Sequence, residues 1–186
     1  MGSEMNERLI EKEISREYKF NGRIFKVAKC KASLSDGTVA DREVVCHSGG
    51  VCILPVDEDM NGYFVRQYRY GAEKVLVEIP AGKLEYGEIP LEAALRDLSE
   101  ETGFEAAQVI SLGAGFSSPA IMTEKIYMYL ALGLKKGKQH LDENEYLDVI
   151  KIPLRQMYEA VISGEIEDFK TQLAVLKSYD YLTRFN

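Results

Sequence analysis

Apolar and polar positions alternate over much of this chain, and the alternation predicts a protein rich in strands. Residues 24–34 and 39–47 alternate in part and are separated by turn-forming residues at 35–38, which predicts a two-stranded antiparallel unit. Two strands alone are marginally stable, so this unit is expected to pack on a larger structure or on a partner chain. The charged residues 4–17 predict a short arm or a helix.

Further apolar runs continue towards the C-terminus. They predict strands at 51–57, 63–70, 75–82, 109–116, 124–134 and 146–152. Asn61 and Gly62 predict a hairpin turn between the first two of these strands. Residues 154–163 and 168–184 have helical spacing, and in the second helix the residues expected to face the sheet are Phe169, Leu173, Leu176 and Tyr179. This order of elements predicts an α/β/α sandwich around a mixed sheet.

Another helix is predicted between the strands, at 90–102. Pro90 suits its first turn, and Gly103 suits its C-terminal end. At about 100° per residue, its apolar face is predicted to consist of Leu91, Ala94, Leu95 and Leu98.

Three acidic residues of this helix share a different face. Asp97, Glu100 and Glu101 stand at i, i+3 and i+4, so their like charges repel one another. No Lys or Arg on that face is expected to offset them, and only Arg96 is near. Such a face is ordinarily a solvated surface, but three carboxylates on a rigid helix also form an oxygen cage suited to a hard divalent cation.

The spacing around these carboxylates resembles the signature of Nudix hydrolases. The pattern Gly-x5-Glu-x7-Arg-Glu-hydrophobic-x-Glu-Glu-x-Gly-hydrophobic is met at Gly82, Glu88, Arg96, Leu98, Glu100, Glu101, Gly103 and Phe104. Six of its seven fixed identities are present, and Asp97 replaces the remaining glutamate. Short motifs rarely carry so many constraints.

The resemblance implies a Mg²⁺-dependent pyrophosphohydrolase, with Mn²⁺ as an alternative metal. The metal ligands that it implies are Asp97, Glu100, Glu101 and the backbone carbonyl of Ala81. Because Asp97 is one methylene shorter than the usual glutamate, we expect it to hold the metal through water or with altered geometry. The alternative is that Asp97 only pairs with a neighbouring side chain.

Other segments resemble the ADP-ribose pyrophosphatases among these enzymes, with matches at Arg42, Glu43, Arg69 and Pro119. In that subfamily the Arg-Glu pair reaches the adenosine end of the substrate across a dimer, and the arginine at 69 contacts phosphate. The alternatives are a surface ion pair for Arg42 and Glu43, and a cross-strand charge partner for Arg69. Pro119 marks the subfamily only by its offset from the signature, and Ala120 follows where glycine is more usual. Glu78, inside an apolar strand, either binds substrate or faces a wet groove.

The acidic loop at 142–145 resembles the loop that supplies the catalytic glutamate in these enzymes. Glu143 is the first candidate and Glu145 the second, because a carboxylate on a loop can close over a site and position a water molecule. Arg96 is counted with them among the catalytic candidates. Plain loop acidity is the alternative.

The resemblance also implies two domains, an N-terminal antiparallel sheet at 1–47 that forms a homodimer and a Nudix domain at 48–186. The net charge of −7 and the pI near 5.0 argue against a nucleic-acid or membrane surface, and no apolar run has transmembrane length. The three cysteines lack zinc spacing and are expected to be reduced. Because the sequence also has no signal-peptide pattern, we expect a cytoplasmic location.

The expected reaction is hydrolysis of ADP-ribose to AMP and ribose 5-phosphate. Two alternatives remain, because a fold and a motif fix the chemistry more firmly than the leaving group. The first is a Nudix hydrolase for another nucleoside diphosphate sugar or dinucleotide. The second is a catalytically weak module that senses a nucleotide.

Overall fold

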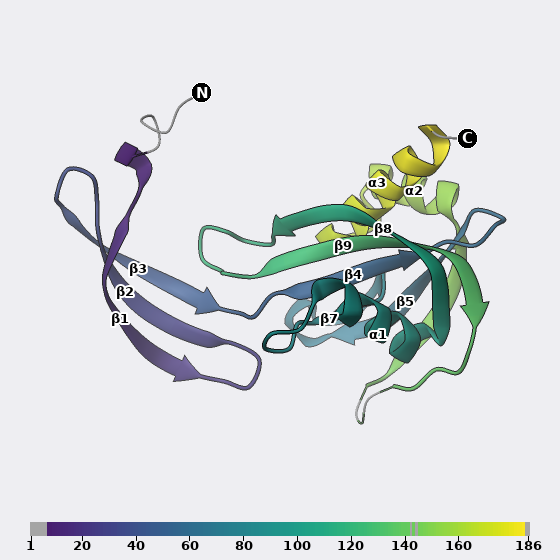
Figure 1. Ribbon diagram of the computed structural model, residues 1–186, viewed down its shortest axis with the longest axis horizontal. Coiled ribbons are helices and arrows are strands. Elements are labelled where there is room, and N and C mark those ends of the chain that lie inside the picture. Colours follow the sequence, from purple (N-terminus) through teal and green to yellow (C-terminus); the bar gives the residue numbers. More distant parts are fainter. Residues whose placement is uncertain (1–6, 142, 144, 185–186) are drawn as a thin grey trace. The chain divides into compact units, whose positions relative to one another are not determined.

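A computed structural model describes residues 7–141, 143 and 145–184 of the chain (Figure 1). Its contacts divide the chain into two compact units. The first unit comprises the chain up to Ser48 together with Phe116–Glu124, and the second comprises Gly49–Gly115 and the chain from Lys125 onwards.

The first unit contains a three-stranded antiparallel sheet of order β1-β2-β3, preceded by a short 3₁₀ helix. Its elements are η2 (Glu7–Leu9), β1 (Lys12–Asn21), β2 (Lys26–Ser33) and β3 (Val39–Cys46). The two strands predicted here are confirmed as β2 and β3. The helix or arm predicted for residues 4–17 is wrong from Lys12 onwards, because that segment completes a hydrogen-bonded ladder with β2. Every residue of β1 is exposed, so its many charges hid the strand pattern.

The second unit contains two sheets. The four-stranded sheet has the order β7-β4-β9-β8, and the three-stranded sheet has the order β10-β5-β6. β4 runs parallel to β9 and antiparallel to β7, so the larger sheet is mixed, as predicted. The strands are β4 (Gly50–Pro55), β5 (Asn61–Arg69), β6 (Lys74–Glu78), β7 (Ala81–Lys83), β8 (Phe104–Phe116), β9 (Lys125–Lys136) and β10 (Leu147–Pro153), with η3 (Tyr70–Ala72) after β5.

Helices cover both faces of the four-stranded sheet. α1 (Pro90–Thr102) packs on β4 and β7, whereas α3 (Phe169–Arg184) packs on β4 and β9 and against α2 (Leu154–Ser163). The alternating side chains of β4 enter two cores: Val51 and Ile53 join the core under α1, and Cys52 and Leu54 join the core under α2 and α3. Burial on both faces explains the continuous apolar run of β4 and confirms the predicted α/β/α sandwich.

The predicted turn at Asn61-Gly62 is wrong by a few residues. Both residues lie in β5, opposite Pro153 and Ile152. The turn precedes them and ends at Met60, whose φ is 60°. The Asp57 carboxylate accepts hydrogen bonds from the Asn61 backbone N–H at 2.9 Å and side-chain amide at 3.0 Å, which closes the turn.

The strand predicted at 75–82 is two strands in different sheets. β6 ends at Glu78 and pairs with β5, whereas β7 begins at Ala81 and pairs with β4. Pro80 lies between them and has no N–H to continue a ladder, while its carbonyl accepts a hydrogen bond from Ile53 N–H at 2.9 Å.

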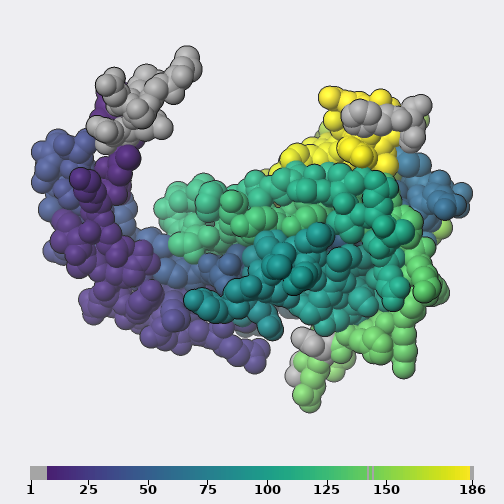
Figure 2. All heavy atoms as spheres, viewed as in Figure 1, coloured from purple at the N-terminus to yellow at the C-terminus, as the bar shows by residue number. Residues whose placement is uncertain are grey.

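The three helices are confirmed, but the predicted apolar faces of α1 and α3 are partly wrong. Leu91 of α1 is exposed, and Phe169 of α3 is 80% exposed. α3 lies against β9 and forms part of the surface of the second unit (yellow in Figure 2). Its buried residues are mostly small: Thr171, Ala174, Val175 and Ser178. Close packing on the sheet therefore favours small side chains over the larger apolar residues of the predicted face.

Two further properties bear on the sequence predictions. All three cysteines are free thiols. Among the described residues, each helix is too short or too polar to span a lipid bilayer.

The end of α1 yields a prediction about stability. Gly103 has φ 73° and caps α1, and a Cβ there would lie 2.7 Å from the Gln139 backbone nitrogen. Gly164 caps α2 with φ 85° and has open space around it. Gly164→Ala should therefore lower the free energy of unfolding by about 1 kcal/mol through backbone strain alone, and Gly103→Ala by at least ~1 kcal/mol more. Urea denaturation of both variants measures the difference. Equal losses would show that the approach of residue 139 does not constrain position 103.

Candidate acidic and cationic site

The acidic face of α1 is largely buried. The two carboxylates Asp97 and Glu101 are each 5% exposed, and only Glu100 keeps substantial contact with solvent. Ala94 and Leu98, one turn apart, anchor the same helix in the core under α1. The interpretation as a solvated surface is therefore wrong for two of the three residues.

Asp97 lies directly on the backbone of β7. A Cβ on Gly82 would be 2.3 Å from Asp97 Oδ2, so only glycine leaves room for this carboxylate. Oδ2 is buried and has no hydrogen-bond partner among the residues that the structure describes. Burial is the main cause that raises the pKa of Asp97 to about 7, against the opposing effect of the nearby Arg96.

Glu101 lies beside the neighbouring residue of the same strand. Ala81 N–H lies 3.4 and 3.3 Å from the two carboxylate oxygens of Glu101. Burial raises the pKa of Glu101 to about 8, and repulsion from Glu145 and Asp97 adds to the rise. β7 thus brings two acidic groups of α1 against the backbone of Ala81 and Gly82.

Arg96 is surrounded by carboxylates. Its guanidinium lies 3.1 Å from Glu88 Oε1, 2.6 Å from Asp97 Oδ1 and 3.1 Å from Glu100 Oε2. The prediction that no cation offsets these charges is therefore wrong, because the long side chain of Arg96 reaches across the helix surface. In this structure Arg96 holds the acidic side chains of the signature; a direct part in catalysis stays a prediction.

The acidic residues fit a divalent cation chemically, although they do not form a closed cage. Within the described part of the chain, no three His, Cys, Asp or Glu side chains converge as a ready metal site. Among the described residues, Oδ2 of Asp97 nevertheless lacks a partner, and Glu101 makes long contacts to the Ala81 N–H. Carboxylate and carbonyl oxygens are the donors that Mg²⁺ and Mn²⁺ prefer. Asp97, Glu100, Glu101 and the Ala81 carbonyl are thus suitable ligands by their chemistry.

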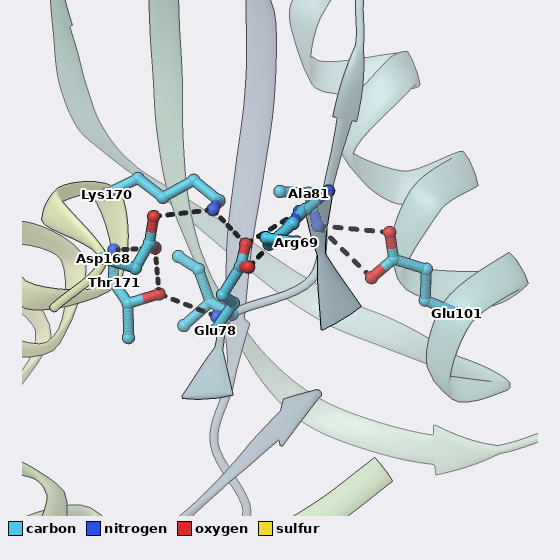
Figure 3. Close-up of polar contacts among 8 residues, drawn as sticks. Arg69, Glu78, Ala81, Glu101, Asp168, Lys170 and Thr171 are labelled. Atoms are coloured by element: carbon cyan, nitrogen blue, oxygen red, sulfur yellow. Dashed lines mark hydrogen bonds and ion pairs between the residues drawn. The ribbon is translucent and has the colours of Figure 1, made fainter. Parts of the chain in front are cut away.

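Arg69 and Glu78 form a second charged cluster near the first (Figure 3). Arg69, at the end of β5, donates from Nε and Nη2 to the two oxygens of Glu78 at 2.6 and 2.8 Å. Glu78 is 1% exposed, so it faces no wet groove. Although burial raises the pKa of Glu78, the hydrogen bonds from Arg69 and the charge of Lys170 lower it below its ordinary value. Glu78 therefore remains ionised as a partner of cations.

The N-terminus of α3 completes this second cluster. Lys170 Nζ contacts Glu78 and also lies 2.9 Å from Asp168 Oδ1. Asp168 Oδ2 accepts hydrogen bonds from the backbone N–H and the hydroxyl of Thr171, at 3.0 and 2.6 Å. Lys170, Asp168 and Thr171 were not predicted from the sequence. An Asp just before an apolar helix signals an N-cap, but nothing local indicates a partner on β6.

Of the two loop candidates for the catalytic carboxylate, Glu145 is the one whose charge acts on the acidic residues of α1. Glu143 is exposed in a turn, whereas Glu145 is half-buried and contributes to the raised pKa of Glu101. Asp142, the first residue of the acidic loop, lies outside the described residues. Glu145 also lines an open groove of about 590 Å³ together with Tyr68 and Tyr146.

The segment before this loop is attached to the C-terminal end of α1. Gln139 Nε2 donates to the Glu101 carbonyl at 2.6 Å, and His140 N–H donates to the Glu100 carbonyl at 2.9 Å. These bonds satisfy carbonyls that every helix leaves unpaired in its last turn. They also fix where the loop begins relative to α1.

The remaining predicted residues behave as surface groups within the units that hold them. Arg42 pairs with Glu11 at 2.6 Å at the surface of the first unit. Glu43 and Pro119 are also exposed. In the second unit, Arg66 pairs with Asp148 at 2.9 Å on the strand face opposite Arg69. Within the second unit, the structure therefore brings together the acidic residues of α1 with Arg69, Glu78, Ala81 and Arg96. The other three predicted residues, Arg42, Glu43 and Pro119, belong to the first unit.

Comparisons with known proteins bear on this site. The family model described as the NUDIX domain matches residues 47–170. The chain is 37% identical over 169 residues to ADP-ribose pyrophosphatase of Bacillus subtilis, covering 90% of this chain and 91% of that protein. It is 40% identical over 167 residues to Methanol dehydrogenase activator of Bacillus methanolicus, covering 89% and 90% respectively.

A solved structure of another protein is similar to this chain in fold. It is described as an ADP compounds hydrolase, and it superposes with a TM-score of 0.82 over 95% of this chain and 96% of that one. The identity is 22%, so this likeness concerns the fold alone.

The buried carboxylates yield a prediction about the pH dependence of stability. The pKa of Glu101 is about 8 in the folded chain and near 4.5 when exposed, so ionisation favours unfolding as pH rises through this interval. In EDTA, Glu101→Gln should raise the free energy of unfolding by more than about 1 kcal/mol at pH 8.5, and the gain should shrink towards pH 5. Glu58→Gln, in the exposed turn after β4, serves as the matched control for a Glu→Gln change at the surface. A gain that is constant with pH would contradict the raised pKa.

Proposed function

Since this chain belongs to the Nudix family of hydrolases, we propose that it is an ADP-ribose pyrophosphatase that yields AMP and ribose 5-phosphate. The observation that carries the proposal is that a buried acidic face, Asp97 and Glu101, lies near the Arg69 guanidinium (Figure 3). The hydrogen bonds to Glu78 and the charge of Glu101 raise the pKa of Arg69. Hydrolysis of a pyrophosphate needs a cation site and a group that binds phosphate oxygens, and this arrangement supplies residues for both. The Bacillus subtilis relative, which is named for this activity, supports the choice of substrate.

Nudix hydrolases generally need a divalent metal, usually Mg²⁺, and we propose the same requirement for this chain. Asp97, Glu100, Glu101 and the carbonyl of Ala81 would hold it. When bound, such a cation neutralises the negative charge that develops on the pyrophosphate. The unpartnered Asp97 Oδ2 supports this assignment over the alternative that Asp97 only pairs with Arg96. The shorter aspartate also makes Mn²⁺ a suitable alternative.

The other residues have distinct parts in the proposed reaction. Arg69 binds phosphate oxygens through the N–H groups that Glu78 does not use, and its side chain is 41% exposed to receive them. Glu145 accepts a proton from the attacking water, in preference to the more exposed Glu143. Arg96 positions the carboxylates that surround it. Glu78 acts on the substrate through Arg69.

We further propose that the first unit forms a homodimer that completes the nucleoside site, with Arg42 and Glu43 as contacts to the adenosine end and Pro119 as a further substrate-binding residue. The exposed strand β1 supports this proposal, because its apolar side chains Ile14, Tyr18 and Phe20 remain 55%, 48% and 52% exposed within the chain. The substrate partner is then a small nucleoside diphosphate sugar. The cytoplasmic location expected from the sequence stays a prediction.

Two other functions have specific support. Relatives of this family act on other nucleoside diphosphate compounds, so a different sugar or dinucleotide is the first alternative. The name of the Bacillus methanolicus relative, an activator, supports a nucleotide-binding module as the second. The retained set of acidic side chains favours hydrolysis over binding alone.

A substrate screen with two variants tests the function. The wild-type chain with Mg²⁺ should release AMP from ADP-ribose faster than it cleaves other nucleoside diphosphate compounds. Glu101→Gln and Asp97→Asn should reduce turnover at least ~100-fold, because each removes a charge from the proposed metal site. Glu58→Gln serves as the control and should retain activity. Chromatographic product analysis decides: near-normal turnover in both site variants would exclude the metal assignment, and cleavage of another compound in place of ADP-ribose would exclude the substrate.

The dimer is tested by sedimentation at assay concentration. We expect a mass of about 42 kDa, twice the 21.0 kDa of one chain. Ile14→Asp should shift the population towards monomer and lower activity in parallel, because it places a charge on the exposed face of β1. Ile162→Asp, an exposed isoleucine of α2, is the matched control. A fully active monomer would exclude shared sites.

A further inference from the structure

Glu78 has two cationic partners, although one would neutralise it. Its carboxylate receives two hydrogen bonds from Arg69 and a third from Lys170 Nζ, and it is almost fully buried (Figure 3). Lys170 is itself held, because Asp168 Oδ1 lies 2.9 Å from its Nζ. The four side chains form a row of alternating charge, from Arg69 through Glu78 and Lys170 to Asp168.

The order of charges in this row decides how much of the Arg69 charge is available. With Arg69 as its only partner, a buried glutamate would cancel most of the positive field of the guanidinium. Lys170 offsets the Glu78 charge from the other side. Arg69 therefore keeps its orientation, fixed by two hydrogen bonds, together with a positive field towards the acidic face, where the pyrophosphate is proposed to bind.

The N-terminus of α3 holds Lys170 in this position. Thr171, the next residue, is fully buried, and its hydroxyl donates to Asp168 Oδ2 at 2.6 Å while accepting from Ile79 N–H at 2.9 Å. Ile79 directly follows Glu78. The helix is thus bonded to both the side chain and the backbone of the segment that orients Arg69.

We propose that Lys170 is a positioning residue for phosphate binding, which acts by offsetting the charge of Glu78 so that Arg69 can bind a pyrophosphate group. The inference rests on the proposed role of Arg69 in pyrophosphate hydrolysis. The start of α3, which lies far outside the Nudix signature in the sequence, would then contribute to substrate affinity.

An electrostatic role and a purely structural role of Lys170 predict different changes in pyrophosphate affinity for two variants. Lys170→Met removes a positive charge next to Glu78, whereas Asp168→Asn removes the negative charge next to Lys170. Asparagine is as good an N-cap as aspartate, so the second change preserves the start of α3. If Lys170 acts through charge, the first change weakens pyrophosphate binding and the second leaves it equal or tighter. If the row only supports the fold, both changes act in the same direction.

The experiment measures two quantities in the full-length chain. The first is the Kd of inorganic pyrophosphate in EDTA at low ionic strength, by calorimetry. The second is the pair KM and kcat for ADP-ribose with Mg²⁺. Lys170→Met should raise both Kd and KM at least ~5-fold while kcat changes less than ~2-fold, because orientation and charge act chiefly on binding. Lys170→Arg should restore both constants to within ~2-fold of wild type.

Lys177→Met is the matched control. Lys177 lies on the same helix and donates to the Leu112 carbonyl, away from Glu78. Equal effects of Lys170→Met and Lys177→Met, a fall in affinity with Asp168→Asn, or no binding of pyrophosphate by the wild type would each overturn the inference. If the wild type binds pyrophosphate with the expected order of variants but does not cleave ADP-ribose, the proposed substrate fails and the role of Lys170 stands.

Discussion

Burial of negative charge on α1 is the constraint on which this site depends. An ionised carboxylate taken out of water costs several kcal/mol unless it is paired, and α1 buries both Asp97 and Glu101. The surroundings are adapted to this cost. Gly82 removes the side chain that would collide with Asp97, Ala81 offers its N–H to Glu101, and Arg96 neutralises part of the charge. The raised pKa values of the two acids show that the compensation is incomplete, which is the condition under which a bound cation adds most stability.

Arg69 and Arg96, the two arginines of the site, use their carboxylate partners differently. Arg96 contacts three acidic residues and is balanced by more negative charge than it carries, so the acidic face remains negative. Arg69 contacts one buried glutamate that is already shared with Lys170, so it keeps more of its positive charge. A cation and a polyanionic substrate need neighbouring regions of opposite sign. The different partners of Arg96 and Arg69 provide these two regions.

Local patterns predicted the elements well, and long-range contacts explain what they could not predict. α1 and its acidic residues followed from helical spacing and from the signature, which lie within one segment. The partnership of Glu78 with Lys170 joins residues 92 positions apart, and no local pattern encodes it. Phe169 and Leu91 have the right spacing for buried faces, yet they are exposed, and smaller residues of the same helices are buried in their place. β1 was missed because its many charged residues hid the alternation of its few apolar side chains.

The break between β6 and β7 brings the two halves of the site together. Within five positions, this segment supplies Glu78 to Arg69, the N–H of Ala81 to Glu101, and the bare backbone of Gly82 to Asp97. A continuous strand would alternate these residues between two faces of one sheet. Pro80 prevents that continuation, and its carbonyl bonds to β4 while Ile79 bonds to α3. The chain thus leaves one sheet and enters the other at the point where the cationic and the acidic clusters meet. The interruption that the sequence did not predict is therefore the feature that assembles the site.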